Sequence, residues 1–220
     1  MEASPSTFLV FGATGRTGQH FVKIALANGH KVKALVRDMT KMKQQHMNLE
    51  LIQGSIMDNE GMDGLLHDVD VVICMLGDAQ QQQKEAINTL FVKRIIPAMR
   101  RQRVKQFLYQ AGGFTRPYKE KLPWLTWILK NTVARRAGLL GQHKDNESVI
   151  EYLVDEAQDI DWIVHRACII AEGPTKGILK RDQTKFSIAT FGDCAAYNYG
   201  LLKDDSAIHT YDLSYYSKSF

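Results

Sequence analysis

Short runs of apolar residues alternate along this chain with longer stretches in which apolar residues recur every three or four positions. The short runs end at glycine or polar turn residues, which is typical of buried strands. The longer stretches are typical of helices with one buried face. The apolar runs predict strands over residues 8–11, 31–36, 49–53, 71–76, 106–110 and 162–166, the last continuing to 170, and a final strand over 208–213.

Three helices are predicted between the first five strands. The first ends at the Asn-Gly pair of residues 28–29, because such a pair favours a helix C-terminus. The second is short and starts at Asp58, whose carboxylate can cap its first turn. The third covers residues 84–102 and is kinked at Pro97, which lacks the backbone donor. Their expected core residues are Gly18, Phe21, Val22, Ala25 and Leu26 in the first, Leu65 and Leu66 in the second, and Ile87, Leu90, Phe91, Ile95 and Met99 in the third.

The second half of the chain is less regular. Residues 114–142 contain two prolines and two tryptophans and show no clear period. A further helix is predicted around residues 149–157. Asp193 is expected to cap a last helix over residues 194–202.

This alternation of strands and helices predicts an α/β fold, a Rossmann-like doubly wound parallel sheet. Residues 71–76 are apolar throughout, so helices should cover both faces of the sheet. No linker rich in Gly, Ser or Pro divides the chain. We therefore expect a single domain over residues 1–220 with a small C-terminal strand–helix–strand extension. Residues 114–142 and 171–220 are expected to form the substrate or lid region.

Composition narrows the classes of function. The chain has 220 residues, is 24% charged and carries a formal net charge of +4. This excess is small for a nucleic-acid binder and suits an enzyme of anionic ligands. No apolar stretch approaches the ~20 residues that a membrane span needs, and residues 1–7 are too short and polar for a signal peptide. Three cysteines without CxxC spacing indicate neither a disulfide framework nor a zinc site. We expect a cytoplasmic protein.

A basic cluster over residues 100–105 does not change this picture. It follows the C-terminal end of the predicted long helix, where positive charge offsets the helix dipole. We interpret it as a solvated surface and not as a nucleic-acid site.

The glycine-rich loop Gly-Ala-Thr-Gly-Arg-Thr-Gly at residues 12–18 carries the chemistry. A strand precedes it, a helix follows it, and a second strand completes a dinucleotide-binding unit. Gly12 lets the chain turn off the strand, Gly15 lets the backbone approach a pyrophosphate, and Gly18 lets the helix pack closely. The helix N-terminus attracts phosphate. Thr14 and Thr17 supply hydroxyl donors.

The end of the second strand indicates which dinucleotide is bound. An acidic residue there accepts a hydrogen bond from the ribose of NAD, whereas arginine binds the 2′-phosphate of NADP. The strand ends in Arg37, with Lys41 beyond it and Arg16 in the glycine loop. Asp38 is better placed to cap the next short helix. These residues favour NADP(H) over NAD(H).

These motifs stand in the order found in a known family. The glycine loop, Leu-Val-Arg-Asp at residues 35–38, Gly54, Leu-Gly at 76–77 and Asp-Trp-Ile-Val-His-Arg at 161–166 follow one another. The chain resembles the atypical short-chain dehydrogenase/reductases, in particular the NmrA-like group and the biliverdin-IXβ reductase/flavin reductase branch. The likeness runs almost end to end.

The resemblance implies further cofactor-binding roles. Arg37 and Lys41 would bind the 2′-phosphate, Ser55 and Ile56 would flank the adenine, and Leu76 and Gly77 would line the ribose and pyrophosphate. Residues 110–112, with Ala111 among them, and the segment Cys168, Ile169 and Ile170 would lie beside the nicotinamide.

Three positions depart from the family pattern. Ser55 replaces the aspartate that usually bonds the adenine amine, which should weaken that contact. Ala111 stands where these reductases commonly carry serine. Ala167 replaces the proline that usually follows the arginine, a milder change.

The usual proton-transfer residues of short-chain dehydrogenases, a serine with Tyr-x-x-x-Lys, are not visible. The spacing occurs at Tyr199 and Lys203, after the sixth strand instead of before it, and we interpret it as a chance match. His143 and His165 are expected to be structural, although His143 could face the nicotinamide. The catalytic residues stay unknown. Trp124 and Trp127 either form an apolar lid over a bound ring or pack under the lid helix.

Two functions follow from these observations. The first is an NADP(H)-binding oxidoreductase-like protein that reduces a flavin, quinone or tetrapyrrole-like acceptor, because hydride transfer to such a ring needs mainly close stacking. The alternative is a non-catalytic NADP(H)-sensing regulator of the NmrA type that binds a partner protein. No metal, nucleic acid or membrane span is expected.

Overall fold

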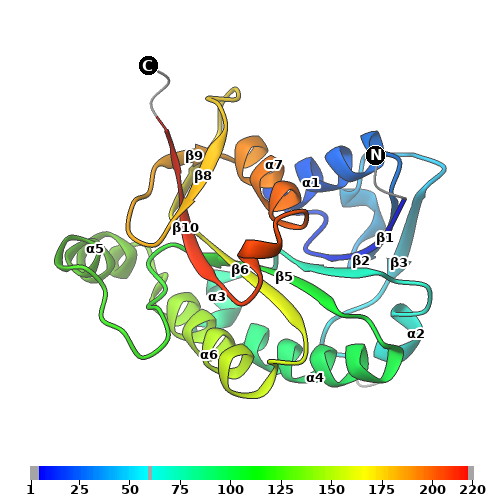
Figure 1. Ribbon diagram of the computed structural model, residues 1–220, viewed down its shortest axis with the longest axis horizontal. Helices are drawn as coiled ribbons and strands as arrows, with labels where there is room; N and C mark the ends of the chain where they lie inside the picture. Colours follow the sequence, from blue (N-terminus) through cyan, green and yellow to red (C-terminus); the bar gives the residue numbers. More distant parts are fainter. Residues whose placement is uncertain (1–4, 59–60, 218–220) are drawn as a thin grey trace.

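The computed structural model describes residues 5–58 and 61–217, and an eight-stranded sheet runs through its centre (Figure 1). The strand order is β3-β2-β1-β4-β5-β6-β10-β8. All neighbours pair in parallel except β8, which is antiparallel to β10. The strands of this sheet are β1 (Thr7–Phe11), β2 (Lys31–Val36), β3 (Leu49–Gln53), β4 (Val71–Cys74), β5 (Gln106–Gly112), β6 (Asp161–Ala167), β8 (Leu179–Asp182) and β10 (Tyr211–Tyr216).

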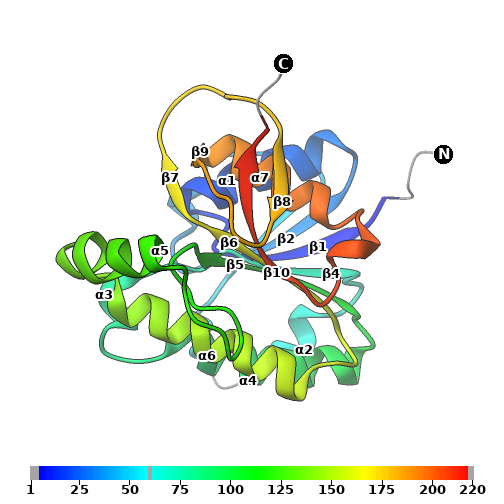
Figure 2. The same cartoon turned by 60° about the vertical axis from the view of Figure 1, so that its left-hand side comes forward.

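Helices cover both faces of the sheet (Figures 1 and 2). One face is packed against α1 (Arg16–Ala27) and α7 (Phe191–Leu201). The other is packed against α2 (Met62–Leu65), α4 (Ile87–Gln102) and α6 (Leu140–Glu156). The predicted Rossmann-like, doubly wound α/β fold in a single domain is therefore confirmed. The remaining elements are α3 (Ala79–Gln82), α5 (Trp124–Leu129), a π-helical segment (Lys130–Ala134), 3-10 turns at Met39–Lys41 and Asp205–Ala207, and a small parallel sheet of β7 (Ile169–Ala171) and β9 (Ile188–Thr190).

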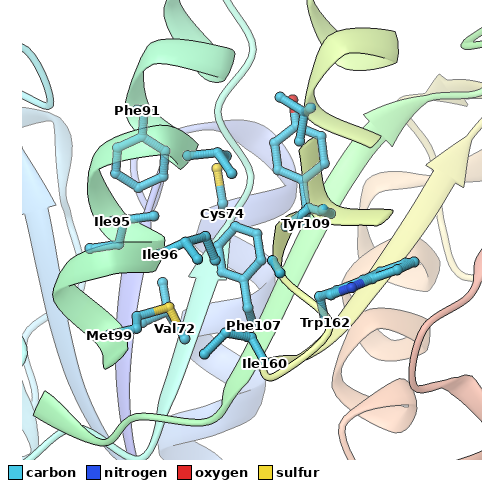
Figure 3. Close-up of a cluster of buried hydrophobic side chains, with 14 of the residues drawn as sticks. Val72, Cys74, Phe91, Ile95, Ile96, Met99, Phe107, Tyr109, Ile160 and Trp162 are labelled. Carbon is cyan, nitrogen blue, oxygen red and sulfur yellow. The ribbon is translucent and has the colours of Figure 1, made fainter. Parts of the chain in front are cut away.

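Strand side chains alternate between two cores. Leu9 and Phe11 of β1 face the core under α4 and α6, and Phe8 and Val10 face the core under α1. Both faces of β4 are buried as well, which explains why its sequence is apolar throughout. Figure 3 shows the larger core, where β4 and β5 meet α4. The residues labelled there are Val72, Cys74, Phe91, Ile95, Ile96, Met99, Phe107, Tyr109, Ile160 and Trp162.

Two of the three predicted helix caps, Asp58 and Asp193, are wrong. Asp58 accepts a hydrogen bond from the Ser55 amide at 2.7 Å and closes its own turn, and α2 begins later, after Gly61. In α7 the cap is Thr190, whose hydroxyl accepts from the Asp193 amide at 3.1 Å. Asp193 is bonded instead to distant groups. An aspartate side chain can accept hydrogen bonds from groups other than the first amides of the next helix, and the local sequence does not show which group it will bind.

The long helix also differs from its prediction. It begins at Ile87, not at residue 84, and a separate short helix, α3, precedes it unpredicted. Leu90 is 40% exposed, and the polar Asn88 takes a fully buried place. Asn88 is tolerated there because its amide donates to the Tyr109 hydroxyl at 2.8 Å and its backbone N–H donates to Asp145 at 3.0 Å. The other four predicted core residues of this helix are buried.

Several strand ends are displaced as well. The predicted strand 71–76 stops at Cys74, and the final strand runs over Tyr211–Tyr216 in place of 208–213. Strand six does not continue to residue 170. It ends at Ala167, and Ile169–Ala171 forms β7, which pairs with β9 in the separate small sheet.

Candidate functional site

A cavity of about 360 Å³ opens at the carboxyl ends of β1 and β4. The chain order reverses direction between these two strands, and ligands of open α/β sheets bind at such a switch point. Nine of the predicted site residues line this cavity together: Gly12, Thr14, Gly15, Arg37, Lys41, Ser55, Ile56, Leu76 and Gly77. Several other residues that line the cavity were not predicted from the sequence, among them Met57, Met75, Asp78, Gln81 and Ile87.

Two glycines of the loop, Gly12 and Gly18, have no space for a side chain. Gly12 has a φ of +83°, and a Cβ there would lie 2.5 Å from the Met75 carbonyl oxygen. The Gly15 amide donates to the Gly12 carbonyl at 3.0 Å and closes the turn. A Cβ on Gly18 would lie 2.1 Å from that same carbonyl oxygen. Gly12 and Gly18 therefore allow the sharp turn and the close helix packing that the sequence predicted for them, beside an open cavity. The approach of Gly15 to a pyrophosphate stays a prediction.

The start of α1 is suited to an anion. Its N-cap is Gly15, which has no side chain to cap the first amides, and the first turn holds no acidic side chain. The amides of a first helical turn have no partners within the helix, and the helix dipole favours negative charge there. The loop therefore fits the pyrophosphate of a dinucleotide.

Two cations at and beyond the end of β2, Arg37 and Lys41, are exposed and line the cavity. Asp38 does not compete with them. Its carboxylate accepts from the Thr40 amide at 3.0 Å and the Thr40 hydroxyl at 2.6 Å. These hydrogen bonds lower the pKa of Asp38. As predicted, Asp38 caps the following turn, and the cavity edge at this point is positive.

The loop after β3 is held from α4. Arg94 donates to the Ile56 carbonyl at 2.8 Å and also to the Asp58 carbonyl. The Ser55 hydroxyl accepts from the Met57 amide at 3.1 Å, so this serine stabilises its own turn. Arg94 was not predicted, because a single arginine on a long helix is not distinguishable in sequence from a solvated one.

Seven predicted site residues lie outside this cavity. Arg16 points to the far side of the loop, where its guanidinium is 3.4 Å from Glu172 and 4.2 Å from the ring centre of Phe191. Thr17 and Gly18 are buried behind the loop. Ala111, Cys168, Ile169 and Ile170 are on β5 and after β6, and Ile169 is 37% exposed.

The ends of β5 and β6 are in close contact. A Cβ on Gly113 would lie 2.0 Å from Cα of Cys168, and the Gly113 amide donates to the Ala167 carbonyl at 2.7 Å. Cys168 is therefore held beside the end of β5, next to residues 110–112.

His143, in the first turns of α6, packs against the same end of β5. A Cβ on Gly112 would lie 2.9 Å from its ring, and the Phe114 ring contacts it edge-on at 5.8 Å. The side chain is buried, and neither ring nitrogen has a hydrogen-bond partner among the described residues. Burial, reinforced by Lys130, lowers its pKa from 6.5 to about 4, so this histidine is neutral at pH 7.

The depressed pKa of His143 predicts a loss of stability in mild acid. The unfolded chain takes up the proton more readily than the folded one. The contribution of His143 is therefore complete above pH 6.5 and declines as the pH falls from 6.5 towards 4. Between pH 7 and 5 the free energy of unfolding should fall by about 2 kcal/mol less in His143→Gln than in the wild type. Urea unfolding at both pH values measures this, and exposed His67→Gln is the control. Equal losses in wild type and His143→Gln would contradict the prediction.

The Tyr-x-x-x-Lys spacing lies away from the cavity. The Tyr199 hydroxyl is 2.9 Å from the His30 ring, which also accepts from the Ser6 amide before β1. Lys203 lies over the face of the Tyr199 ring at 4.4 Å. The pair is therefore at the opposite end of β1 from the glycine loop, in agreement with its interpretation as a chance match.

His165 is also structural, as predicted. It is fully buried, and its two ring nitrogens are bonded to Asn198 at 2.6 Å and Ser214 at 2.8 Å. This histidine joins β6 to α7 and β10.

The two tryptophans of the irregular region are exposed. Trp124 is 73% exposed and Trp127 is 58% exposed. The interpretation that they pack under a lid helix is wrong, because they belong to the outer face of α5 itself. Nothing in the described residues tests the lid interpretation.

Residues 5–58 and 61–217 contain no group of three or more His, Cys, Asp or Glu side chains arranged for a metal ion. None of their helices is long and apolar enough to cross a membrane.

Comparisons with known proteins agree with the cavity. A family model described as NAD(P)H-binding matches residues 12–195. A probable pinoresinol-lariciresinol reductase 3 of Arabidopsis thaliana is 29% identical over 106 residues, which are 44% of this chain and 35% of that protein. The matched stretch spans about a third of the length of such curated relatives.

Solved structures share the fold at low identity. ChuY, an anaerobillin reductase from Escherichia coli O157:H7, superimposes with a TM-score of 0.77 at 15% identity over 98% of this chain and 99% of its own. A short-chain dehydrogenase/reductase (wide type) from Veillonella parvula in complex with NADP superimposes with a TM-score of 0.74 at 11% identity over 98% and 99%.

Proposed function

The chain belongs to the NAD(P)H-binding family, and on that premise we propose that it is an NADP(H)-dependent reductase of a flavin, quinone or tetrapyrrole-like acceptor. One observation carries the proposal. The cavity at the β1–β4 switch point combines a glycine loop at a helix N-terminus with two exposed cations at the end of β2. Such a cavity suits a dinucleotide with a 2′-phosphate.

The preference for NADP(H) rests on Arg37 and Lys41. Both line the cavity, and Asp38, the carboxylate that would favour NAD, is bonded to Thr40. A guanidinium can donate two parallel hydrogen bonds to a phosphate. NADP(H) therefore gains a contact here that NAD(H) lacks.

In this proposal the protein binds and orients, and the cofactor supplies the hydride. Gly12 and Gly15 bring backbone amides to the pyrophosphate. The loop that Arg94 holds, with Ser55 and Ile56, flanks the adenine. Ala111 and the segment from Cys168 to Ile170 lie towards the nicotinamide side, beyond the cavity itself.

The reductase class is supported by the named relatives. The Arabidopsis relative is by name a probable reductase, and ChuY is by name a reductase of anaerobillin. A conjugated ring stacked on a nicotinamide can accept hydride without a tyrosine that donates a proton. This agrees with the position of Tyr199 away from the cavity.

Turnover is tested directly by following the absorbance of NADPH while the protein is offered a panel of flavins, quinones and biliverdins. We expect oxidation of NADPH with at least one acceptor class, faster than oxidation of NADH. Acceptor and cofactor without protein form the blank. If no acceptor speeds the oxidation above this blank, the reductase proposal fails.

A second candidate is an NADP(H)-sensing regulator of the NmrA type. Ala111 favours it, because a serine is common at this position in the reductases that the chain resembles. A partner protein recovered with only one redox state of the cofactor, combined with no turnover, would support the regulator. Turnover with a physiological acceptor would count against it.

A further inference from the structure

Three large apolar side chains of helix α5 face outward, although a helix that packs on a core buries such a face. Trp124, Trp127 and Ile128 follow the i, i+3, i+4 spacing and share one face, and they are 73%, 58% and 40% exposed. Thr126, on the opposite face, is 4% exposed and bonded to the Pro123 carbonyl at 2.7 Å. A surface helix normally turns its apolar face inward. We call Trp124, Trp127 and Ile128 the tryptophan face.

This helix extends from the side of the molecule. Figures 1 and 2 both show α5 projecting from the body beside the start of α6. Thr126 on its buried side and the N-cap residue Pro123 line a second cavity that Gly113 and Arg166 also line, near the end of β5. The tryptophan face is therefore turned outward from the same end of the molecule to which we assign the nicotinamide side.

The surroundings of the tryptophan face are basic. Residues 116–136 hold six basic side chains and one acidic side chain, Glu120. Among the described residues, the ion pairs of this segment are those of Arg116 and Lys130 with glutamates of α6. Lys121, Arg135 and Arg136 are exposed and take part in none of these pairs. The apolar face thus has uncompensated positive charge at both ends.

We propose that the tryptophan face is a docking surface for an anionic lipid bilayer. Tryptophan is enriched where protein meets the membrane interface, because its ring is apolar and its N–H is polar. A helix with tryptophans on one face and flanking basic residues is typical of surface binding without a span. The charge of the surface favours an anionic bilayer as the binding partner, because negatively charged phosphate headgroups complement Lys121, Arg135 and Arg136. Binding to the bilayer does not depend on the proposed reductase activity.

Vesicle sedimentation tests the proposal on the full chain. We expect binding to vesicles of equal parts phosphatidylcholine and phosphatidylglycerol, and little binding to phosphatidylcholine alone. The tryptophan emission of Trp124 and Trp127 should shift to the blue and be quenched by brominated lipid. Trp162, which is 1% exposed in the core, should be unaffected.

Two variants separate the apolar and charged contributions. The double replacement Trp124→Ala with Trp127→Ala should weaken vesicle binding on the order of 100-fold. Arg135→Gln with Arg136→Gln should weaken it by roughly 20-fold. Since all four side chains are exposed, both variants should fold, and their thermal unfolding verifies this.

Matched controls come from elsewhere on the surface. Ile178→Ser removes an apolar side chain that is 85% exposed, and Lys23→Gln with Lys31→Gln removes two exposed charges. Neither should change binding by more than about twofold. The proposal is overturned if anionic vesicles fail to bind, if neutral vesicles bind equally well, or if the tryptophan emission shifts because the chain self-associates.

Discussion

Replacement of Gly18 by alanine is expected to abolish measurable dinucleotide binding and to lower the free energy of unfolding by about 3 kcal/mol. The new Cβ would lie 2.1 Å from the Gly12 carbonyl oxygen and 2.9 Å from Cα of Ala13. Both are backbone atoms, so no side chain can rotate away. Either α1 must move off the sheet or the loop must open, and each change displaces the amides meant for the pyrophosphate. Isothermal calorimetry with NADP and urea unfolding measure the two effects.

The matched control is Gly200→Ala. Gly200 is also a helical glycine, but nothing lies within 4 Å of a Cβ placed on it. Because alanine favours a helix over glycine, this variant should gain roughly 0.5–1 kcal/mol and bind the dinucleotide normally. If Gly18→Ala keeps its affinity while losing stability, the close contact serves only packing, and the loop is not the phosphate site.

Replacement of Arg37 by alanine should reduce affinity for NADP by roughly 30- to 100-fold and leave affinity for NAD almost unchanged. A hydrogen-bonded contact between guanidinium and phosphate is worth about 2–3 kcal/mol, and only NADP carries the 2′-phosphate. Arg37 is exposed on the cavity wall, so its loss should not disturb the fold. Parallel titrations with both dinucleotides make the measurement.

Lys43→Ala is the control for general electrostatics. Lys43 is exposed and close in sequence, but it does not line the cavity. Its removal should change NADP affinity by less than about threefold. If Arg37→Ala loses affinity for NADP and for NAD equally, the arginine does not bind the 2′-phosphate.

Much of this molecule could be predicted from local patterns. Strands β2 and β3 and the end of α4 agree with their predicted bounds. Runs of apolar residues and a helical repeat of apolar positions can both be recognised from residues that are neighbours in the sequence. The nine predicted residues that meet in one cavity come from the ends of parallel strands, and such ends necessarily lie at one edge of the sheet.

The local sequence was least informative where a residue has a partner far away in the chain. Asn88 is buried where its side-chain amide donates to Tyr109 and its backbone N–H donates to Asp145, and Leu90 is left exposed beside it. Arg16 was assigned to the cofactor, yet it lies against Glu172 and Phe191, which are more than 150 positions later in the sequence. The repeat of apolar and polar positions within one element does not show which distant residues will contact it.

The sequence by itself therefore determined the α/β alternation, the glycine loop and the cations beside it, since each depends on residues that are neighbours along the chain. Only the tertiary structure decided that Arg94 holds the loop after β3, that Tyr199 bonds to His30, and that α5 turns its tryptophans outward. These arrangements depend on which distant groups meet when the helices pack on the sheet. Hydrogen-bond partners and burial are settled at that step.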